Sequence, residues 1–146
     1  MASVDIEIIC RQITNSIEKQ MISRGYRVTN EIRNGVMTTL KGQGHGRIYK
    51  VPGTMHKHYT ASAPGEVPAN RTGAYRMSWR PATYVNGVGG GLTVVSQCQS
   101  HHRVNGYVLG DLLEGGTRKM APRPHLKKIR DKVEPRAVRI YNEPYV

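Results

Sequence analysis

A stripe of isoleucines near the N-terminus constrains the fold of this chain more than any other feature. Ile6, Ile9, Ile13, Ile17 and Met21 recur at spacings of three and four residues, which places them on one face of an α-helix. The polar residues of the same segment face away: Arg11, Asn15, Glu18 and Lys19. The pattern predicts a helix over roughly residues 3–41 with this stripe in the core.

The ends of this helix have recognisable signals. Ser3 is the expected N-cap, and Asp5 and Glu7 lie in the first turn, where the helix dipole favours acids. Gly25 can end or kink the helix, after which an apolar spacing of four resumes until the glycines of residues 42–46. We therefore expect one long or broken helix.

The middle of the chain indicates short strands and loops. Residues 47–51 alternate and predict a strand, whereas residues 52–73 are rich in Pro, Gly, Ser and Ala and have no period. Long loops without internal structure are usually functional, so we expect residues 52–73 to form an exposed arm that reaches a neighbouring subunit. Residues 74–88 and 92–99 are strand-like and flank the turn-forming run NGVGGG, which predicts a β-hairpin.

Two further helices complete the expected fold. Residues 107–113 predict a short second helix, which closes on Gly115 and Gly116, and residues 125–133 predict a basic final helix after two prolines. The fold class that follows is α+β: a long N-terminal helix packed on a small antiparallel sheet with a β-hairpin and a second short helix.

The composition indicates a thin core. The chain of 146 residues is 38% hydrophobic, contains no Phe and has 16 Gly. A core this thin favours a subunit that buries its remaining apolar surface against neighbours. Cys10 and Cys98 are too few for a disulfide framework, so we expect free thiols and assembly in a reducing cytosol. Neither a signal peptide nor a membrane span is recognisable, and no membrane partner is expected.

The charge of the chain predicts an acidic partner. Lys and Arg number 22 against 10 Asp and Glu, a net charge of +12. Residues 118–132 contain seven basic residues and one acid, so this segment alone carries 7 − 1 = +6. A localised excess of this kind is typical of a contact zone for phosphate or carboxylate groups.

No chemistry of a known enzyme class is recognisable. Cys98, His101 and His102 form a C-x-x-H-H pattern, but a structural zinc needs four ligands and no second close pair completes this one. The GQGHG run at residues 42–46 lacks the context of a phosphate-binding loop and is expected to be a hinge. We therefore predict no catalytic, cofactor-binding or metal-binding residues, and a protein that is not an enzyme.

Two segments carry a resemblance to a known family, SAPGEVPANRTGAYRMSW at residues 62–79 and GYVLGDLLEGGTRKMAPRPHLKKI at residues 106–129. Together they resemble the small tail-completion or head-tail joining proteins of long-tailed bacteriophages. The matching positions are Ala61, Ser62, Pro64, Gly65, Glu66, Pro68, Ala69, Thr72, Gly73, Tyr107, Leu113, Glu114, Gly116, Thr117, Lys119, Met120, Arg123 and Pro124. Gly115 and His125 depart from the family pattern, because aromatic residues are common at both positions.

The resemblance implies a virion protein of the phage neck or upper tail, assembled in the host cytoplasm. Such a protein forms a homo-oligomeric ring, expected to be a hexamer, that joins the head connector to the tail tube and contacts neck, connector or tail-tube proteins. Contact with genomic DNA in the channel is a further expectation. The domain implied is residues 1–133, and residues 134–146 are expected to be a C-terminal tail that orders only on a partner.

The same motifs supply the interface candidates: Pro64, Gly65, Glu66, Pro68, Glu114, Thr117, Arg118, Lys119, Met120, Arg123 and Pro124. Glu114 is expected either to pair with Arg118 or Arg123 or to be a solvated residue at a helix end.

The alternative function is a basic nucleic-acid-binding module. The basic segment of residues 118–132 supports it, together with Tyr141 and Tyr145, which could stack on bases. No known nucleic-acid-binding signature accompanies this charge.

Overall fold

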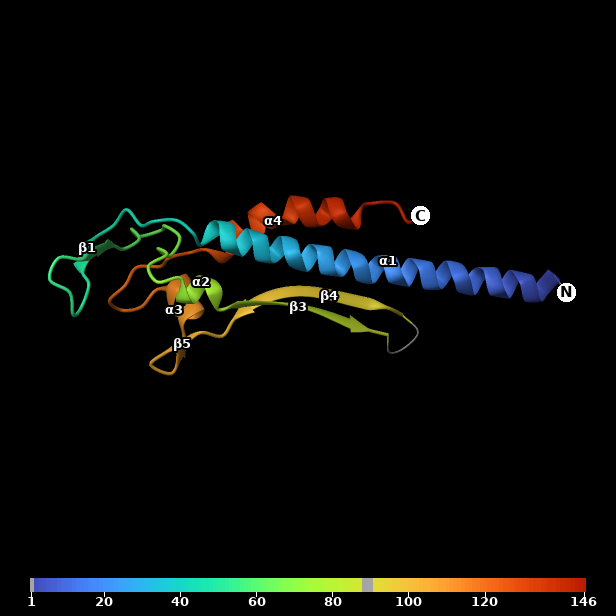
Figure 1. The fold of residues 1–146 in the computed structure, drawn as a ribbon, viewed down its shortest axis with the longest axis horizontal. Coiled ribbons are helices and arrows are strands. Elements are labelled where there is room, and N and C mark those ends of the chain that lie inside the picture. The colour runs from blue at the N-terminus through green and yellow to red at the C-terminus, as the bar shows by residue number, and fades with distance from the viewer. Residues whose placement is uncertain (1, 88–90) are drawn as a thin grey trace.

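The computed structural model describes residues 2–87 and 91–146 and has an elongated α+β fold (Figure 1). Its elements in chain order are α1 (Ala2–Thr39), β1 (Ile48–Lys50), β2 (His58–Thr60), α2 (Ala74–Met77), β3 (Trp79–Asn86), β4 (Thr93–Ser100), β5 (Arg103–Val104), β6 (Tyr107–Val108), α3 (Leu109–Gly115) and α4 (Leu126–Tyr141). The predicted fold class is confirmed. No helix in the described parts of the chain is both long and apolar enough to cross a membrane.

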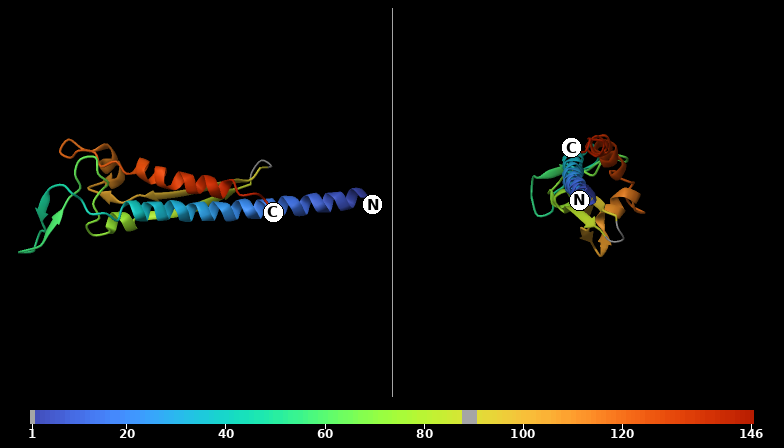
Figure 2. Two further views of the ribbon diagram at one scale, coloured as in Figure 1. Left: turned by 90° about the horizontal axis from the view of Figure 1, so that it is seen from above. Right: turned by 90° about the vertical axis from the view of Figure 1, so that its right-hand side faces the viewer.

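Helix α1 runs along most of the long axis of the molecule, and Gly25 does not interrupt it (Figures 1 and 2). The β3–β4 hairpin and α4 both pack against α1. A Cβ atom at Gly25 would overlap Cγ1 of Val94 in the hairpin, and one at Gly35 would overlap Cγ2 of Val133 in α4. These two glycines therefore allow both neighbours to approach the helix backbone.

The predicted hairpin is confirmed as β3 paired antiparallel with β4, with Thr83 opposite Ser96. Two polar contacts hold its inner face on α1: Thr29 Oγ1 lies 2.7 Å from Thr83 Oγ1, and Ser96 Oγ donates to the carbonyl of Gly25 at 2.6 Å. Residues 88–90 of the predicted turn lie outside the described residues. Before the hairpin, residues 74–77 form helix α2 and not the start of a strand.

The loop predicted at residues 52–73 is partly ordered as a strand. Within it, β2 pairs antiparallel with β1, so that Tyr49 lies opposite Tyr59. A second small hairpin, β5–β6, turns at Asn105 and Gly106, both with positive φ. The strand predicted at residues 47–51 is β1, but neither pairing was predicted, because β2, β5 and β6 are too short to show a period.

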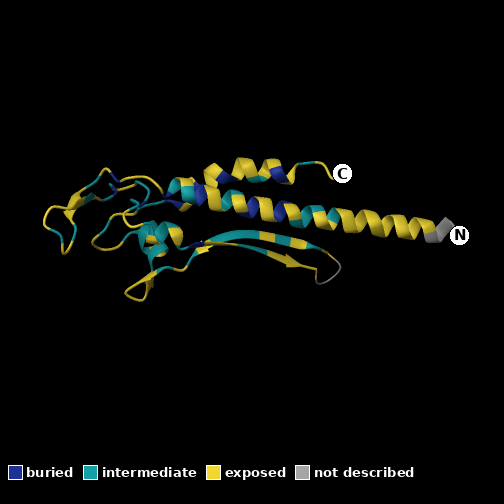
Figure 3. Cartoon of the chain, in the orientation of Figure 1, coloured by how far each residue is buried: buried dark blue, intermediate teal, exposed yellow. Residues whose placement is uncertain are grey.

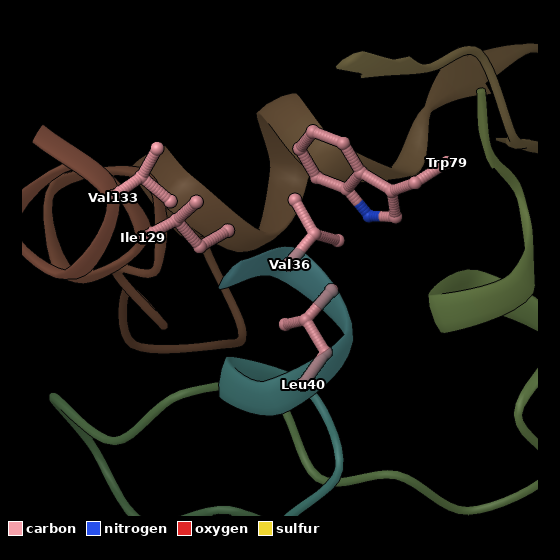
Figure 4. Packing of buried hydrophobic residues seen from close by; sticks show 5 residues of the cluster. All are labelled: Val36, Leu40, Trp79, Ile129 and Val133. Atoms are coloured by element: carbon pink, nitrogen blue, oxygen red, sulfur yellow. The ribbon is translucent and has the colours of Figure 1, made fainter. Parts of the chain in front are cut away.

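The hydrophobic core lies at the C-terminal end of α1, where Val36 and Leu40 meet Trp79, Ile129 and Val133 (Figure 4). The predicted stripe is helical, but its N-terminal part is not in this core (Figure 3). Ile6, Ile9 and Ile13 are 60%, 53% and 54% exposed. The prediction that Ile13 faces the core is therefore wrong for the single chain, because α4 and the hairpin do not extend along this part of α1.

The boundary expected at residue 133 falls inside α4, which continues to Tyr141. Pro135 removes one backbone donor from the helix, but Val133 and Ile140 are buried, and this packing outweighs the local preference.

The last residues are also ordered on this chain, contrary to the expectation of a free tail. The buried Arg24 donates to the carbonyls of Tyr141 (3.1 Å) and Pro144 (3.0 Å). Arg27 makes a two-pronged ion pair with Glu143, at 2.6 and 2.7 Å. The side chain of Arg24 thus supplies a partner for the tail within the same subunit.

Candidate interaction surface at the loop junction

The two segments that carry the family resemblance meet in space. We call residues 42–46, 61–73 and 113–125 together the loop junction. The amide of Gly65 donates to the carbonyl of Pro122 at 3.1 Å, and Arg123 Nε donates to Ser62 Oγ at 2.8 Å. Lys128 Nζ, in the first turn of α4, donates to the carbonyl of Gly65 at 3.0 Å. Segments separated by about half of the chain therefore form one folded unit.

Glu66 organises the turn of residues 63–66. Its carboxylate accepts hydrogen bonds from the amides of Ala63 (2.7 Å) and His45 (3.1 Å) and lies 2.9 Å from His45 Nδ1. The two backbone hydrogen bonds, helped by the His45 side chain, lower the pKa of Glu66 to about 2. Glu66 is therefore a structural acceptor at neutral pH.

The glycines of the 42–46 run are packed against the 61–73 segment. Gly46 donates to the carbonyl of Ala61 at 2.7 Å, and the amide of Asn70 donates to the carbonyl of Gly42 at 3.0 Å. A Cβ at Gly44 would overlap the carbonyl of Ala61. Close backbone approach thus explains Gly44 and Gly46, which were predicted only as part of a hinge, whereas a Cβ at Gly42 would meet nothing.

Residues 117–120 form a tight exposed turn. The amide of Thr117 donates to the carbonyl of Met120 at 2.8 Å, and the amide of Met120 donates back to Thr117 at 3.2 Å. Gly116 enters the turn with a φ of 74°, where a Cβ would lie 2.8 Å from the nitrogen of Pro122. The turn presents Arg118 and Lys119 to solvent.

Glu114, which lies in α3, caps the N-terminus of α4. Its Oε2 accepts hydrogen bonds from the amides of His125 (3.0 Å) and Leu126 (3.3 Å) and lies 3.1 Å from His125 Nδ1. First-turn amides lack helical partners, and the helix dipole favours a negative charge beside them. The expected pairing of Glu114 with Arg118 or Arg123 is wrong, because these amides and the buried imidazole take up the carboxylate.

His125 is buried in a small aromatic cluster with Tyr75 and Trp79. Its Nδ1 faces two acceptors, Glu114 and the carbonyl of Arg123, while Nε2 lies 2.8 Å from the Tyr75 hydroxyl. All three contacts are satisfied when Nδ1 carries the proton and Nε2 accepts from Tyr75. Burial, followed by the charges of Glu114 and Asp111, raises the pKa of Tyr75, which keeps this phenol protonated. The departure from the family pattern at position 125 is thus accommodated by polar partners.

The predicted interface residues divide into two groups. Five are exposed: Pro64, Gly65, Thr117, Arg118 and Lys119. The others are buried or half-buried: Glu66, Pro68, Glu114, Met120, Arg123 and Pro124. Arg123 in particular is held by Ser62 and by the carbonyl of Ala121 at 2.8 Å. The exposed group is the part of the loop junction that a neighbour can reach.

Two surfaces outside the loop junction were not recognised from the sequence as sites. The first is the bare N-terminal part of α1, and the second is the basic β1–β2 hairpin. The absence of acids from residues 32–65 was the available signal for the second surface. For metal binding, no three His, Cys, Asp or Glu side chains within residues 2–87 and 91–146 group closely enough to hold an ion.

Comparison with known proteins adds no relative: no family model, no curated protein and no solved structure matches this chain.

Proposed function

We propose that this chain is a structural subunit of the neck or upper tail of a long-tailed bacteriophage, and not an enzyme. It would form a ring that joins the head connector to the tail tube and act by contact, without turnover. The observation that carries the proposal is the apolar stripe of α1, which the folded chain leaves uncovered.

The bare stripe supports self-assembly. A helix face with three isoleucines more than half exposed costs free energy in water, and that cost is removed when a neighbour covers the face. A neighbour that covers it with a different part of its own surface generates a head-to-tail contact, which closes into a ring when the rotation between subunits permits. The family resemblance supplies six as the expected number of subunits and the virion as the location.

The exposed part of the loop junction is the proposed contact with the adjoining connector or tail-tube proteins. Arg118 and Lys119 lie at the tip of a turn whose backbone is fixed by its own hydrogen bonds. Exposed cations on a fixed backbone favour an acidic surface on a neighbouring ring.

Complementation of a phage that lacks this subunit tests the proposal. Arg118→Glu combined with Lys119→Glu should leave the protein folded but give separate heads and tails, because like charges facing each other across an interface cost several kcal/mol. The control is Arg118→Lys with Lys119→Arg, which keeps both charges and should restore joining. Normal numbers of joined particles with the charge-reversed protein would overturn the assignment of this contact.

The alternative function is a basic nucleic-acid-binding module. The structure weakens one argument that the sequence offered for it. The ring of Tyr145, one of the two tyrosines expected to stack on bases, lies against the guanidinium of Arg24 at 3.9 Å. That contact reduces the ring face available to a base. The charge distribution of the β1–β2 hairpin is more favourable to nucleic acid.

A further inference from the structure

The middle of the chain is almost free of carboxylates. Between Glu31 and Asp111 the sequence contains a single acid, Glu66. The same stretch contains nine basic residues: Arg33, Lys41, Arg47, Lys50, Lys57, Arg71, Arg76, Arg80 and Arg103. A positive field is therefore concentrated in the elements that this stretch forms.

The β1–β2 hairpin, residues 47–60, projects from the end of the molecule opposite the N-terminus (Figure 1). Lys50 and Lys57 are exposed on it, together with His56 and His58. None of the ion pairs among the described residues involves Arg47, Lys50, Lys57 or Arg71. These cations are free to meet an anionic partner.

Two tyrosines hold two of the cations in place. The rings of Tyr49 and Tyr59 stack across the hairpin with centroids 5.6 Å apart. The guanidinium of Arg47 lies 5.6 Å from the centroid of Tyr49, and that of Arg71 lies 4.1 Å from the centroid of Tyr59. Cation–π contacts of this kind restrict the side chains while leaving their N–H donors available.

A cavity at the base of the hairpin gathers further donors. It has a volume of about 410 Å³, and its lining includes Gln43, His58, Thr60, Asn70 and Arg71. No carboxylate lines it. Glu66, the single acid between Glu31 and Asp111, is engaged by His45 and by the amide of Ala63. The cavity therefore suits a phosphate group better than a cation.

We propose that the β1–β2 hairpin and the cavity at its base bind the phosphate backbone of nucleic acid. The contact is to the backbone and not to the bases, because each tyrosine ring already packs against the other ring and one guanidinium. Phosphate contacts from Arg, Lys and polar side chains carry no sequence information, so duplex DNA of any sequence is the expected ligand. The proposal does not depend on ring assembly.

Binding of the full chain to a labelled random-sequence duplex over a range of salt concentrations tests this inference. The wild-type protein should bind with an affinity that falls steeply with salt. Lys50→Gln combined with Lys57→Gln should weaken binding and reduce the slope of log affinity against log salt by about two, since each lost phosphate contact lowers it by about one. Both lysines are exposed, so an unchanged thermal melt should accompany the loss.

The matched control is Lys127→Gln combined with Lys132→Gln, which removes the same charge from the exposed side of α4 and should leave the slope unchanged. Absence of binding by the wild-type protein, or equal losses in the two variants, would overturn the inference. Displacement of the duplex by polyglutamate at equal charge concentration would also overturn it, in favour of an acidic protein partner. Ring formation is measured separately on the same variants and should persist, so the two proposals fail independently.

Discussion

Glu114 shows at the scale of single residues why charge alone misleads. Its sequence neighbours Arg118 and Arg123 suggested an ion pair, yet its carboxylate meets two backbone amides and a buried imidazole. Those partners come from the start of α4, whose position next to α3 depends on the tertiary fold. The sequence shows which cations lie near Glu114 along the chain, but it does not show that the N-terminus of α4 lies beside its carboxylate.

Replacing Glu114 tests this role. Glu114→Ala should lower the free energy of unfolding by about 1–3 kcal/mol, because it leaves the buried His125 and the first-turn amides without their acceptor. Glu114→Gln keeps one acceptor oxygen and should cost less. Urea denaturation gives both values. The control is Glu134→Ala, which removes an exposed carboxylate paired with Arg130 and should change stability by less than about 0.5 kcal/mol. Equal effects at the two positions would contradict the capping role.

Glu66 predicts an acid sensitivity of the loop junction. The folded protein lowers the pKa of this carboxyl to about 2, below its ordinary value of 4.5. The corresponding stabilisation is therefore fully present above pH 4.5 and is lost as the pH falls toward 2. The free energy of unfolding measured across this range should fall less steeply for Glu66→Gln than for the wild type. Parallel curves would show that Glu66 is not held as described.

At the scale of elements, the long periodic segments were predicted well, and most strands of two or three residues were not. The helix over residues 3–41 and the β3–β4 hairpin are confirmed, because each has enough residues to show its period. The strand predicted at residues 47–51 is confirmed as β1, whereas β2, β5 and β6, which have two or three residues each, were missed. Asn105-Gly106 is a recognisable hairpin turn and was the available signal for β5–β6.

Gly25 shows what a helical pattern cannot reveal. The sequence left open whether this glycine ends or kinks the helix; the helix continues through it, and the missing side chain admits Val94 of β4. Close approach of another element leaves no mark in the periodicity of the helix itself. The extension of α4 through Pro135 was missed for a related reason, since burial of Ile140 on α1 is a tertiary effect.

Gly25→Ala tests this contact. Alanine is the better helix former by about 1 kcal/mol, so the change would stabilise an exposed helix. Here we expect destabilisation by about 1–3 kcal/mol, because the new methyl group overlaps Val94. Adding Val94→Ala should recover part of the loss, and thermal or urea unfolding of the four-member cycle measures the coupling. A more stable Gly25→Ala protein would show that the hairpin does not pack this closely.

At the scale of the whole molecule, the thin core anticipated from composition is the cluster at one end of α1. The sequence did not indicate where the core stops along the helix, because apolar residues recur at spacings of three and four in both its covered and its bare parts. The structure shows that the core does not reach Ile6, Ile9 and Ile13. This exposed part of α1 is the main argument for a partner. The loop junction and the β1–β2 hairpin lie at the end of the molecule opposite the bare N-terminal part of α1 (Figure 1). We therefore assign self-assembly and contact with neighbouring proteins to separate surfaces.

The most direct test of self-assembly through the bare stripe is native mass spectrometry of the full chain and two variants. Ile13→Asp places a charge on the stripe, whereas Asn15→Asp places the same charge on the opposite side of the same helix. We expect closed rings of one size for the wild type and for Asn15→Asp. Ile13→Asp should be a monomer that keeps its helical circular dichroism spectrum. A wild-type protein that stays monomeric at all concentrations, or rings that survive Ile13→Asp, would contradict the account.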